Sequence, residues 1–344
     1  MKTIFTICLS CLSLVIANAQ SAGKSVFAFL NTPNSARSVS LGSNFISTID
    51  NDISTAWNNP ASLNELSNKQ FFASYNNYIL DINSGYASYA RHFKKYGTFA
   101  ASILYLDYGK FNGYDFAGIS TGEFKVQDQC INFSYGNKLN NKFRVGANLK
   151  YIYSVYESYV SNGVSTDLSG IYEDTSKKLL MTAYARNIGF QAIPFNGSSR
   201  TPLPFELAFS ISKKLDHLPL RYHLIFHNLQ RPDMRYTITE TGLKDESGNK
   251  LEKKMTMGDN ILRHLGLGGE LNLSKHFVLR FGYDHMRRKE MTQEQKRGMA
   301  GFSWGLGFRI KKLHISYGSA SFFAGYSINQ FSLNMNLGEF YKSK

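Results

Sequence analysis

Short stretches in which apolar and polar residues strictly alternate follow one another between residues 70 and 340. In residues 302–310 the apolar members are Phe302, Trp304, Leu306, Phe308 and Ile310. Residues 205–212, 277–284 and 331–337 alternate in the same way. Because successive side chains of a β-strand point to opposite faces, a period of two indicates strands with one apolar and one polar face. The chain is therefore predicted to be all-β.

The alternation predicts fourteen strands along this part of the chain. Their centres lie near residues 74, 88, 103, 131, 148, 167, 183, 208, 224, 267, 281, 306, 317 and 334. Short links follow the even-numbered strands, at 94–95, 137–142, 174–178, 213–219, 274–276 and 311–312. Longer links follow odd-numbered strands, at 107–123, 187–203, 229–260 and 285–299, and Thr237–Thr241 is prone to form a hairpin within the third of these.

The sorting of links by length decides between two all-β architectures. In a soluble sandwich the apolar faces point inward, whereas in a membrane barrel they face lipid and the polar faces line the lumen. Bacterial outer-membrane barrels combine short periplasmic turns with long external loops, and a sandwich has no reason to do so. We therefore predict a transmembrane antiparallel β-barrel of about fourteen strands over residues 69–344.

The N-terminus has the pattern of a cleavable export signal over residues 1–19. Lys2 precedes an apolar stretch, 4–16, and Ala17-Asn18-Ala19 is an A-x-A cleavage site. A membrane anchor is the alternative, but a spanning helix needs about 20 apolar residues. Removal of the signal leaves Cys130 as the single cysteine, which excludes an internal disulfide. A closed barrel needs none, because every strand bonds to two neighbours.

The net charge of +14 narrows the possible partners. Such a charge is compatible with nucleic acid, but an export signal argues against it, so no nucleic acid is expected. Outer-membrane lipid and lipopolysaccharide phosphates are the expected counter-charges. Lysine pairs at 94–95, 177–178, 213–214 and 311–312 are predicted to lie at the periplasmic rim.

Residues 20–68 do not alternate and are rich in Asn, Ser and Ala. Pro60 argues against a central strand. The segment carries apolar residues such as Phe27, Phe29 and Trp57, so it is predicted to be buried. We interpret it as a plug in the barrel lumen, with a separate small domain as the alternative.

No constellation of catalytic, metal-binding or cofactor-binding residues emerges from the sequence. His223 and His227 share a predicted strand, where they lie about 13 Å apart, too far to hold one metal. Gly305-Leu306-Gly307 lies in a strand and lacks the third glycine of a dinucleotide motif, so it more simply admits the plug. We predict that the chain is not an enzyme and needs no cofactor.

The predicted lumen faces carry charge, which in a dry core would be costly. These residues are Arg144, Lys150, Glu206, Arg221, Glu270, Arg280 and Arg309. They either anchor the plug, which we favour, or line a solute path. Together with Arg37, Trp57, Asn59 and Pro60 of the plug, Arg144, Lys150, Glu206, Arg280 and Arg309 are the candidate plug–lumen contacts.

Ala36-Arg37, Leu41-Gly42 and Asn59-Pro60-Ala61 resemble the plug of FadL-like fourteen-strand barrels. A second set of runs is Gly23–Phe27, Asn59–Ala61, Tyr89–Lys94, Gly97–Ala100, Gly146–Lys150, Leu203–Phe205 and His227–Arg231. In this order they resemble one branch of these barrels more closely, the PorQ family of the type IX secretion system. The resemblance implies a scaffold in the cell-surface attachment complex, beside PorZ, the sortase PorU and the barrel PorV, that joins secreted cargo to lipopolysaccharide. The alternative is a FadL-like outer-membrane transporter of hydrophobic solutes. For a scaffold, loops 229–260 and 285–299, with Lys253, Lys254, Arg287 and Arg288, are the candidate partner surface.

The export signal predicts that the mature protein begins at Gln20. Mass spectrometry of the N-terminal peptide from isolated outer membranes measures this directly. A mature N-terminus at a lipid-modified Cys11 would contradict the prediction.

Overall fold

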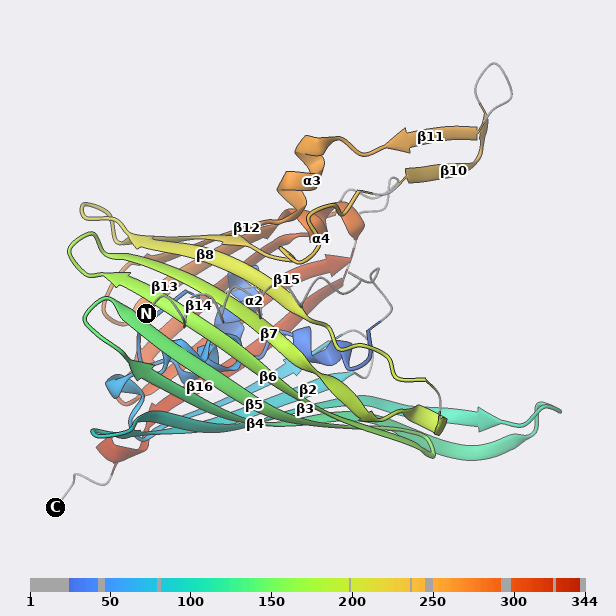
Figure 1. Cartoon of the computed structure of the whole chain (residues 1–344), viewed down its shortest axis with the longest axis horizontal. Coiled ribbons are helices and arrows are strands. Elements are labelled where there is room, and N and C mark those ends of the chain that lie inside the picture. Colours follow the sequence, from blue (N-terminus) through green and yellow to red (C-terminus); the bar gives the residue numbers. More distant parts are fainter. Residues whose placement is uncertain are drawn as a thin grey trace, which may run out of the picture.

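The computed structural model describes residues 25–42, 47–78, 82–197, 199–235, 237–244, 250–291, 298–323 and 326–340. Fourteen antiparallel strands form a closed barrel in the order β1-β16-β15-β14-β13-β12-β9-β8-β7-β6-β5-β4-β3-β2 (Figure 1). Pairing of β1 with β16, from Gln70↔Asn336 to Asn77↔Asn329, closes the ring. No helix in the described part of the chain is long and apolar enough to cross a membrane. The predicted fold class is confirmed.

Each predicted strand centre lies within one strand of the barrel. The strands are β1 (Gln70–Asn77), β2 (Asn83–Phe93), β3 (Gly97–Tyr114), β4 (Ser120–Lys138), β5 (Phe143–Tyr156), β6 (Tyr159–Asp174), β7 (Leu179–Ile193), β8 (Glu206–Lys214), β9 (Leu220–Phe226), β12 (Leu265–Asn272), β13 (Phe277–Asp284), β14 (Phe302–Ile310), β15 (Leu313–Phe323) and β16 (Tyr326–Asn336). The export signal, residues 1–19, lies outside the described residues.

Burial along the strands is inverted relative to a soluble protein. Polar residues such as Ser210 and Asn132 are fully buried, whereas Phe281 and Phe331 expose 51% and 56% of their surface. The apolar face of each strand therefore points outward and the polar face lines the lumen, which is the arrangement of a membrane barrel and rules out the sandwich. Where Phe281 lies opposite Gly269 on the outer face, its ring covers the glycine.

The six predicted short links lie at one end of the barrel, but the opposite end differs from the prediction in two places. The range 107–123 is mostly not a loop, because β3 and β4 continue as one hairpin to Tyr114 and Ser120. Backbone pairing joins its two strands, and a stacked Phe111–Phe124 pair and an exposed Lys110–Glu123 ion pair lie across them. The range 187–203 is likewise strand as far as Ile193.

The loop at 229–260 contains the expected hairpin, formed by β10 (Thr237–Lys244) and β11 (Lys250–Lys254). Two short helices stand at the same end, α3 (Met257–Arg263) and α4 (His285–Glu290). They are joined by Asp259, which accepts from Arg263 at 3.0 Å and lies 3.3 Å from both His285 and Lys289. Burial alone would raise the pKa of the Asp259 carboxyl, but these hydrogen bonds hold it below its ordinary value.

The N-terminal segment lies inside the barrel (Figure 1). It consists of short helical elements: η1 (Ala28–Asn31), α2 (Ala36–Ser40), η2 (Ile53–Trp57), η3 (Pro60–Ser62) and η4 (Glu65–Ser67). Helix α2 contacts β13 to β16, and η3 contacts β4, β5 and β6 on the other side of the lumen. The segment is therefore a plug and not a separate domain. Two further 3-10 turns, η5 (Phe195–Gly197) and η6 (Leu337–Glu339), lie outside it.

The outward position of Phe281, in the middle of β13, predicts a large cost for a charge at this site. Phe281→Arg should destabilise the barrel by about 2–4 kcal/mol, because the guanidinium would enter lipid near the midplane. Urea titration of the heat-modifiable form in lipid vesicles measures the loss. Leu273→Arg, in the exposed link after β12, is the matched control and should cost much less. Equal losses for both variants would mean that Phe281 does not face lipid.

Candidate functional site

The plug segment Ala36–Gly42, which includes helix α2, lies on a strip of four strands, β12 to β15, each of which supplies a glycine. Gly268 of β12 is paired with Gly282 of β13, and Gly305 of β14 is paired with Gly318 of β15. A Cβ atom on Gly282, Gly305 or Gly318 would collide with atoms of the segment Ala36–Gly42. Only glycine therefore lets the helix approach this closely. The role predicted for Gly305, to admit the plug, is confirmed.

Arg37 of α2 joins the plug to the wall through its guanidinium. Nε and Nη2 donate to the two carboxylate oxygens of Glu270 on β12, at 2.8 and 2.7 Å. Nη1 donates to Asp50 of the plug at 2.7 Å and to Asp52 at 3.4 Å. Glu270 also accepts from Arg280 Nε on β13, at 3.0 Å. The candidates Arg37 and Arg280 thus meet at a single carboxylate.

This cluster is almost entirely withdrawn from solvent, since the side chains of Arg37, Glu270 and Arg280 are at most 9% exposed. His223 Nε2 lies 3.4 Å from Glu270. Buried charges persist only when they are paired and hydrogen-bonded. Here Arg37 and Arg280 share the Glu270 carboxylate of the wall, and Arg37 also pairs with the plug carboxylates named above. The cluster fixes the position of α2 relative to β12 and β13. In the described part of the chain no group of His, Cys, Asp and Glu could hold a metal ion.

A second set of contacts holds η2 and η3 against β5 and β6. Lys150 Nζ pairs with Asp167 at 2.6 Å and lies 4.7 Å from the centre of the Trp57 ring. Asn148 Nδ2 donates to the carbonyl oxygens of Ala56 and Trp57, at 3.1 and 3.0 Å. Next to them Asn59 and Pro60 are buried, and the Ala61 N–H donates to Ser169 Oγ at 2.9 Å.

The remaining lumen candidates lie in different surroundings. Glu206 pairs with Arg186 of β7, a partner that the sequence did not indicate, and Arg186 Nη1 donates to Asn58 of the plug at 2.8 Å. Arg144 donates to the carbonyl of Leu63 at 3.4 Å. Arg309 is exposed and lines a groove of about 720 Å³ at the end with the short turns, beside Glu65 and Lys69.

The candidate partner residues at the other end of the barrel are only partly described. The side chains of Lys253 and Lys254 lie outside the described part. Arg287 of α4 lies over the Phe322 ring, 4.1 Å from its centre, and donates to the Gly42 carbonyl at 3.2 Å. Arg288 donates to the carbonyl of Gly298. Both arginines therefore make contacts within the protein, which attach α4 to neighbouring segments of the same chain.

An apolar cluster fills the space between the plug and the wall formed by β1 to β5. It consists of Phe27, Phe29, Leu30, Ile53, Ala56, Trp57, Leu63, Phe72, Tyr86, Ala90, Ala100, Leu104, Leu106, Cys130, Ile152 and Leu203. Leu203 belongs to the segment that precedes β8. The cluster thus extends from the centre of the lumen to the link between β7 and β8.

The wall is interrupted at this link. Strand β7 continues to Ile193, but its pairing with β8 ends at Arg186↔Glu206. Beyond that point side chains replace the ladder: Asn187 Nδ2 donates to the Pro204 carbonyl at 3.0 Å, and Gln191 accepts from the Thr201 N–H at 2.9 Å. The plug joins here as well, because the Val26 N–H donates to the Pro202 carbonyl at 3.0 Å.

The architecture is similar to that of solved FadL-like barrels. The toluene transporter TbuX of Ralstonia pickettii matches with a TM-score of 0.53 at 13% identity, over 90% of this chain and 98% of that one. The Pseudomonas putida toluene transporter TodX matches with a TM-score of 0.52 at 11% identity, over 90% and 99%. A Pseudomonas aeruginosa FadL homologue matches with a TM-score of 0.51 at 11% identity, over 88% and 98%.

No protein-family model matches the chain. No curated protein matches its sequence. At these identities the likeness establishes a FadL-like fold, namely a plugged fourteen-strand barrel.

The cluster around Glu270 predicts a large effect of a single substitution. Glu270→Leu should destabilise the barrel by about 3–5 kcal/mol, because it leaves buried Arg37 and Arg280 without their shared carboxylate. Urea titration of the heat-modifiable form measures this. Glu123→Leu, which removes an equally short but exposed ion pair with Lys110, is the control and should have little effect. A loss no larger than that of the control would show that the cluster does not hold the plug.

Proposed function

We propose that this protein is an outer-membrane barrel that passes small hydrophobic solutes. The observation that carries the proposal is the apolar cluster between plug and wall, which runs from Trp57 to Leu203 at the interrupted wall. An apolar solute needs a path lined by apolar side chains. In a barrel whose lumen is otherwise polar, this cluster is the surface along which such a path can run. The fold is shared with TbuX and TodX, which are described as toluene transporters.

The interruption of the wall supplies an exit from this path. Where β7 and β8 are no longer paired, the wall is held by single side-chain bonds such as Asn187 to Pro204 and Thr201 to Gln191. Such bonds open at a lower cost than a continuous ladder, so this link is the part of the wall that yields first. Phe190 and Ile193 are exposed beside it, on the outer surface that we assign to lipid. A solute would leave the lumen here without crossing the charged cluster at Glu270.

Uptake of radiolabelled toluene by cells that carry or lack the barrel tests the proposal. Leu203→Lys should reduce uptake to the level of cells without the barrel, because it places a charge where the apolar cluster meets the wall. Leu218→Lys, in an exposed turn, is the control and should transport normally. The amount of heat-modifiable barrel must be equal in all strains. Equal uptake with and without the barrel would contradict transport of this solute class.

A second candidate function is the scaffold that the sequence resemblance implies, in the attachment complex of type IX secretion with PorZ, PorU and PorV. The projecting β10–β11 hairpin favours it, because transport does not require a strand pair that extends beyond the barrel (Figure 1). The likeness to solved structures lends this candidate no support. Deletion of residues 240–256 should leave the barrel heat-modifiable and weaken co-purification of those partners. Unchanged co-purification would remove the candidate.

A further inference from the structure

Trp57 lies in the apolar cluster between plug and wall and carries one polar group, the indole N–H. Its side chain is fully buried, and within the described residues this N–H has no hydrogen-bond partner. An indole nitrogen can donate but cannot accept. A buried donor without an acceptor is costly, so one that is retained points to a bound molecule that accepts from it. The solute path proposed above brings such a molecule to Trp57.

A second polar group of the same kind belongs to Tyr86 of β2. The Tyr86 ring meets the Trp57 ring edge to face, with 5.7 Å between the ring centres. The side chains of Ser88, Ser102 and Asn34 lie near its hydroxyl group, but none of them is in hydrogen-bonding geometry with it. Tyr86 is 3% exposed and belongs to the same apolar cluster. Two polar groups at one contact between plug and wall are therefore unbonded within the described part of the chain.

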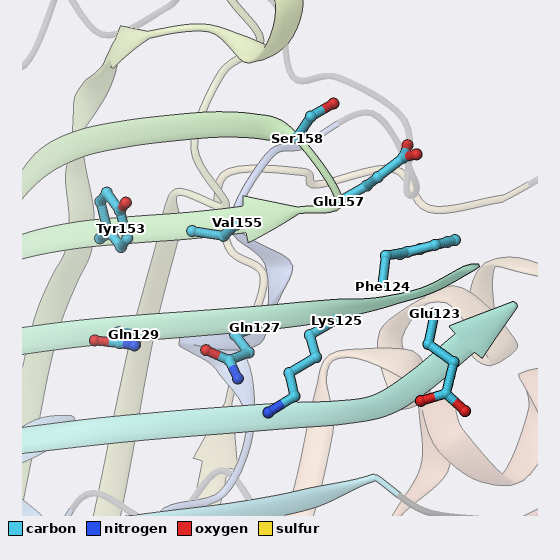
Figure 2. Close-up of a pocket in the computed structure, with 9 residues that line it drawn as sticks. All are labelled: Glu123, Phe124, Lys125, Gln127, Gln129, Tyr153, Val155, Glu157 and Ser158. Atoms are coloured by element: carbon cyan, nitrogen blue, oxygen red, sulfur yellow. The ribbon is translucent and has the colours of Figure 1, made fainter. Parts of the chain in front are cut away.

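The lumen face of β4 adds a hydrogen-bond acceptor. Asn132 is fully buried, and its Nδ2 donates to two serine hydroxyls at 3.2 and 3.0 Å, whereas its Oδ1 accepts from no described residue. Its cross-strand neighbour is Lys150, whose Nζ lies over the Trp57 ring. Gln127 and Gln129, at odd-numbered positions of β4, point away from the lumen and line a groove of about 510 Å³ outside the barrel (Figure 2). Asn132 therefore offers its acceptor to the lumen, on the side where Trp57 lies.

The charge beside Trp57 is already balanced. Lys150 Nζ is 4.7 Å from the centre of the Trp57 ring and pairs with Asp167 at 2.6 Å. Both side chains of this pair are only 1% exposed. A carboxylate that approached Lys150 would also approach Asp167, and like charges in a buried site repel each other strongly. The unbonded groups around Trp57 therefore suit a polar group without charge.

We infer that the path favours hydrophobic solutes that carry a single uncharged hydroxyl group, of which alkylphenols are the simplest class. The Trp57 N–H donates to the solute oxygen, and Tyr86 and Asn132 supply oxygens that can accept its proton. The rings of Trp57, Tyr86 and Phe72, which contact one another edge to face, pack against the apolar part of the solute. A solute without the hydroxyl leaves these polar groups unpaired, so the site discriminates against it. The inference rests on the proposed transport of hydrophobic solutes and adds the polar group that is recognised.

Equilibrium binding of p-cresol and toluene to the full-length barrel in lipid vesicles tests the inference, because the two compounds differ by one hydroxyl group. Measured against protein-free vesicles, the barrel should bind p-cresol at least about tenfold more tightly than toluene. p-Toluate, which carries a carboxylate instead, should bind more weakly than p-cresol. Toluene binding that equals or exceeds p-cresol binding, as expected if only water occupies the site, would overturn this inference alone. Tightest binding of p-toluate would also overturn it, whereas binding of none of the three would contradict the solute path itself.

Two variants assign the preference to the named groups, since Trp57→Phe and Tyr86→Phe each remove one polar group and keep an aromatic ring. Each should lower the affinity for p-cresol about tenfold and leave the affinity for toluene unchanged. Trp304→Phe, on the outer face where the ring is 52% exposed, is the matched control and should keep both affinities. If Trp57→Phe yields no heat-modifiable barrel, Tyr86→Phe decides alone, because it removes only a hydroxyl. A preference for p-cresol that persists in the folded variants would overturn the inference.

Discussion

A barrel of fourteen strands encloses a lumen that the side chains of its own wall cannot fill, since about eight strands mark the limit for a filled interior. Many wall residues on that side are polar, such as Asn132, Ser210 and Asn334, whereas their neighbours along each strand face outward and are apolar. Whatever occupies the lumen must therefore satisfy the polar groups of the wall, pack against its apolar side at β1 to β5 and still displace water. The plug meets this requirement with short helical turns whose backbone groups are bonded by wall side chains. Ser332 accepts from the Ala36 N–H at 2.8 Å, and Asn334 donates to the Asn51 carbonyl at 3.0 Å.

The plug is held differently on its two sides, and this difference links the fold to the proposed function. Toward β12 to β15 a glycine strip and the Arg37–Glu270–Arg280 cluster fix α2 closely to the wall. Toward β1 to β5 the contact is mainly apolar, from Phe29 and Leu30 to Leu104. Apolar contacts are not directional, whereas buried charge pairs tolerate little displacement. An apolar solute can therefore replace part of the second contact without disturbing the first.

The sequence predicted the barrel well because strand period and link length are local properties. It could place Arg280 and Glu270 on the lumen face, since side chains alternate between the two faces of a strand. It could not show that Arg37 reaches Glu270, because that pairing spans 233 residues and depends on barrel closure. Alternation along a strand predicts which face a residue occupies, but not how far it lies from the rim of the barrel. Arg309 occupies the predicted face and is exposed at the rim.

Two further features escaped sequence reasoning for physical reasons. The extension of β3 and β4 beyond residue 107 is rich in glycine and charge, which hides the strand period. Its hairpin becomes visible only in the structure, through backbone pairing as far as Tyr114↔Ser120 and the stack of Phe111 on Phe124. Arg186 is the last residue before the predicted link at 187–203, and it was not counted among the lumen residues although the strand centred near 183 includes it. A strand bulge is present where Asn187 adopts a left-handed backbone conformation, and alternation breaks at such a bulge.

Disulfide trapping tests most directly whether the plug fills the lumen as described. Ser47 Oγ of the plug lies 3.0 Å from Thr182 Oγ1 on β7. In a Cys130→Ala background, Ser47→Cys with Thr182→Cys should form a disulfide in isolated outer membranes. Ser47→Cys with Ser332→Cys, on β16 seven strands away around the barrel, should not. A correctly folded, heat-modifiable barrel in which the first pair stays reduced, or the second pair is oxidised equally well, would contradict the account.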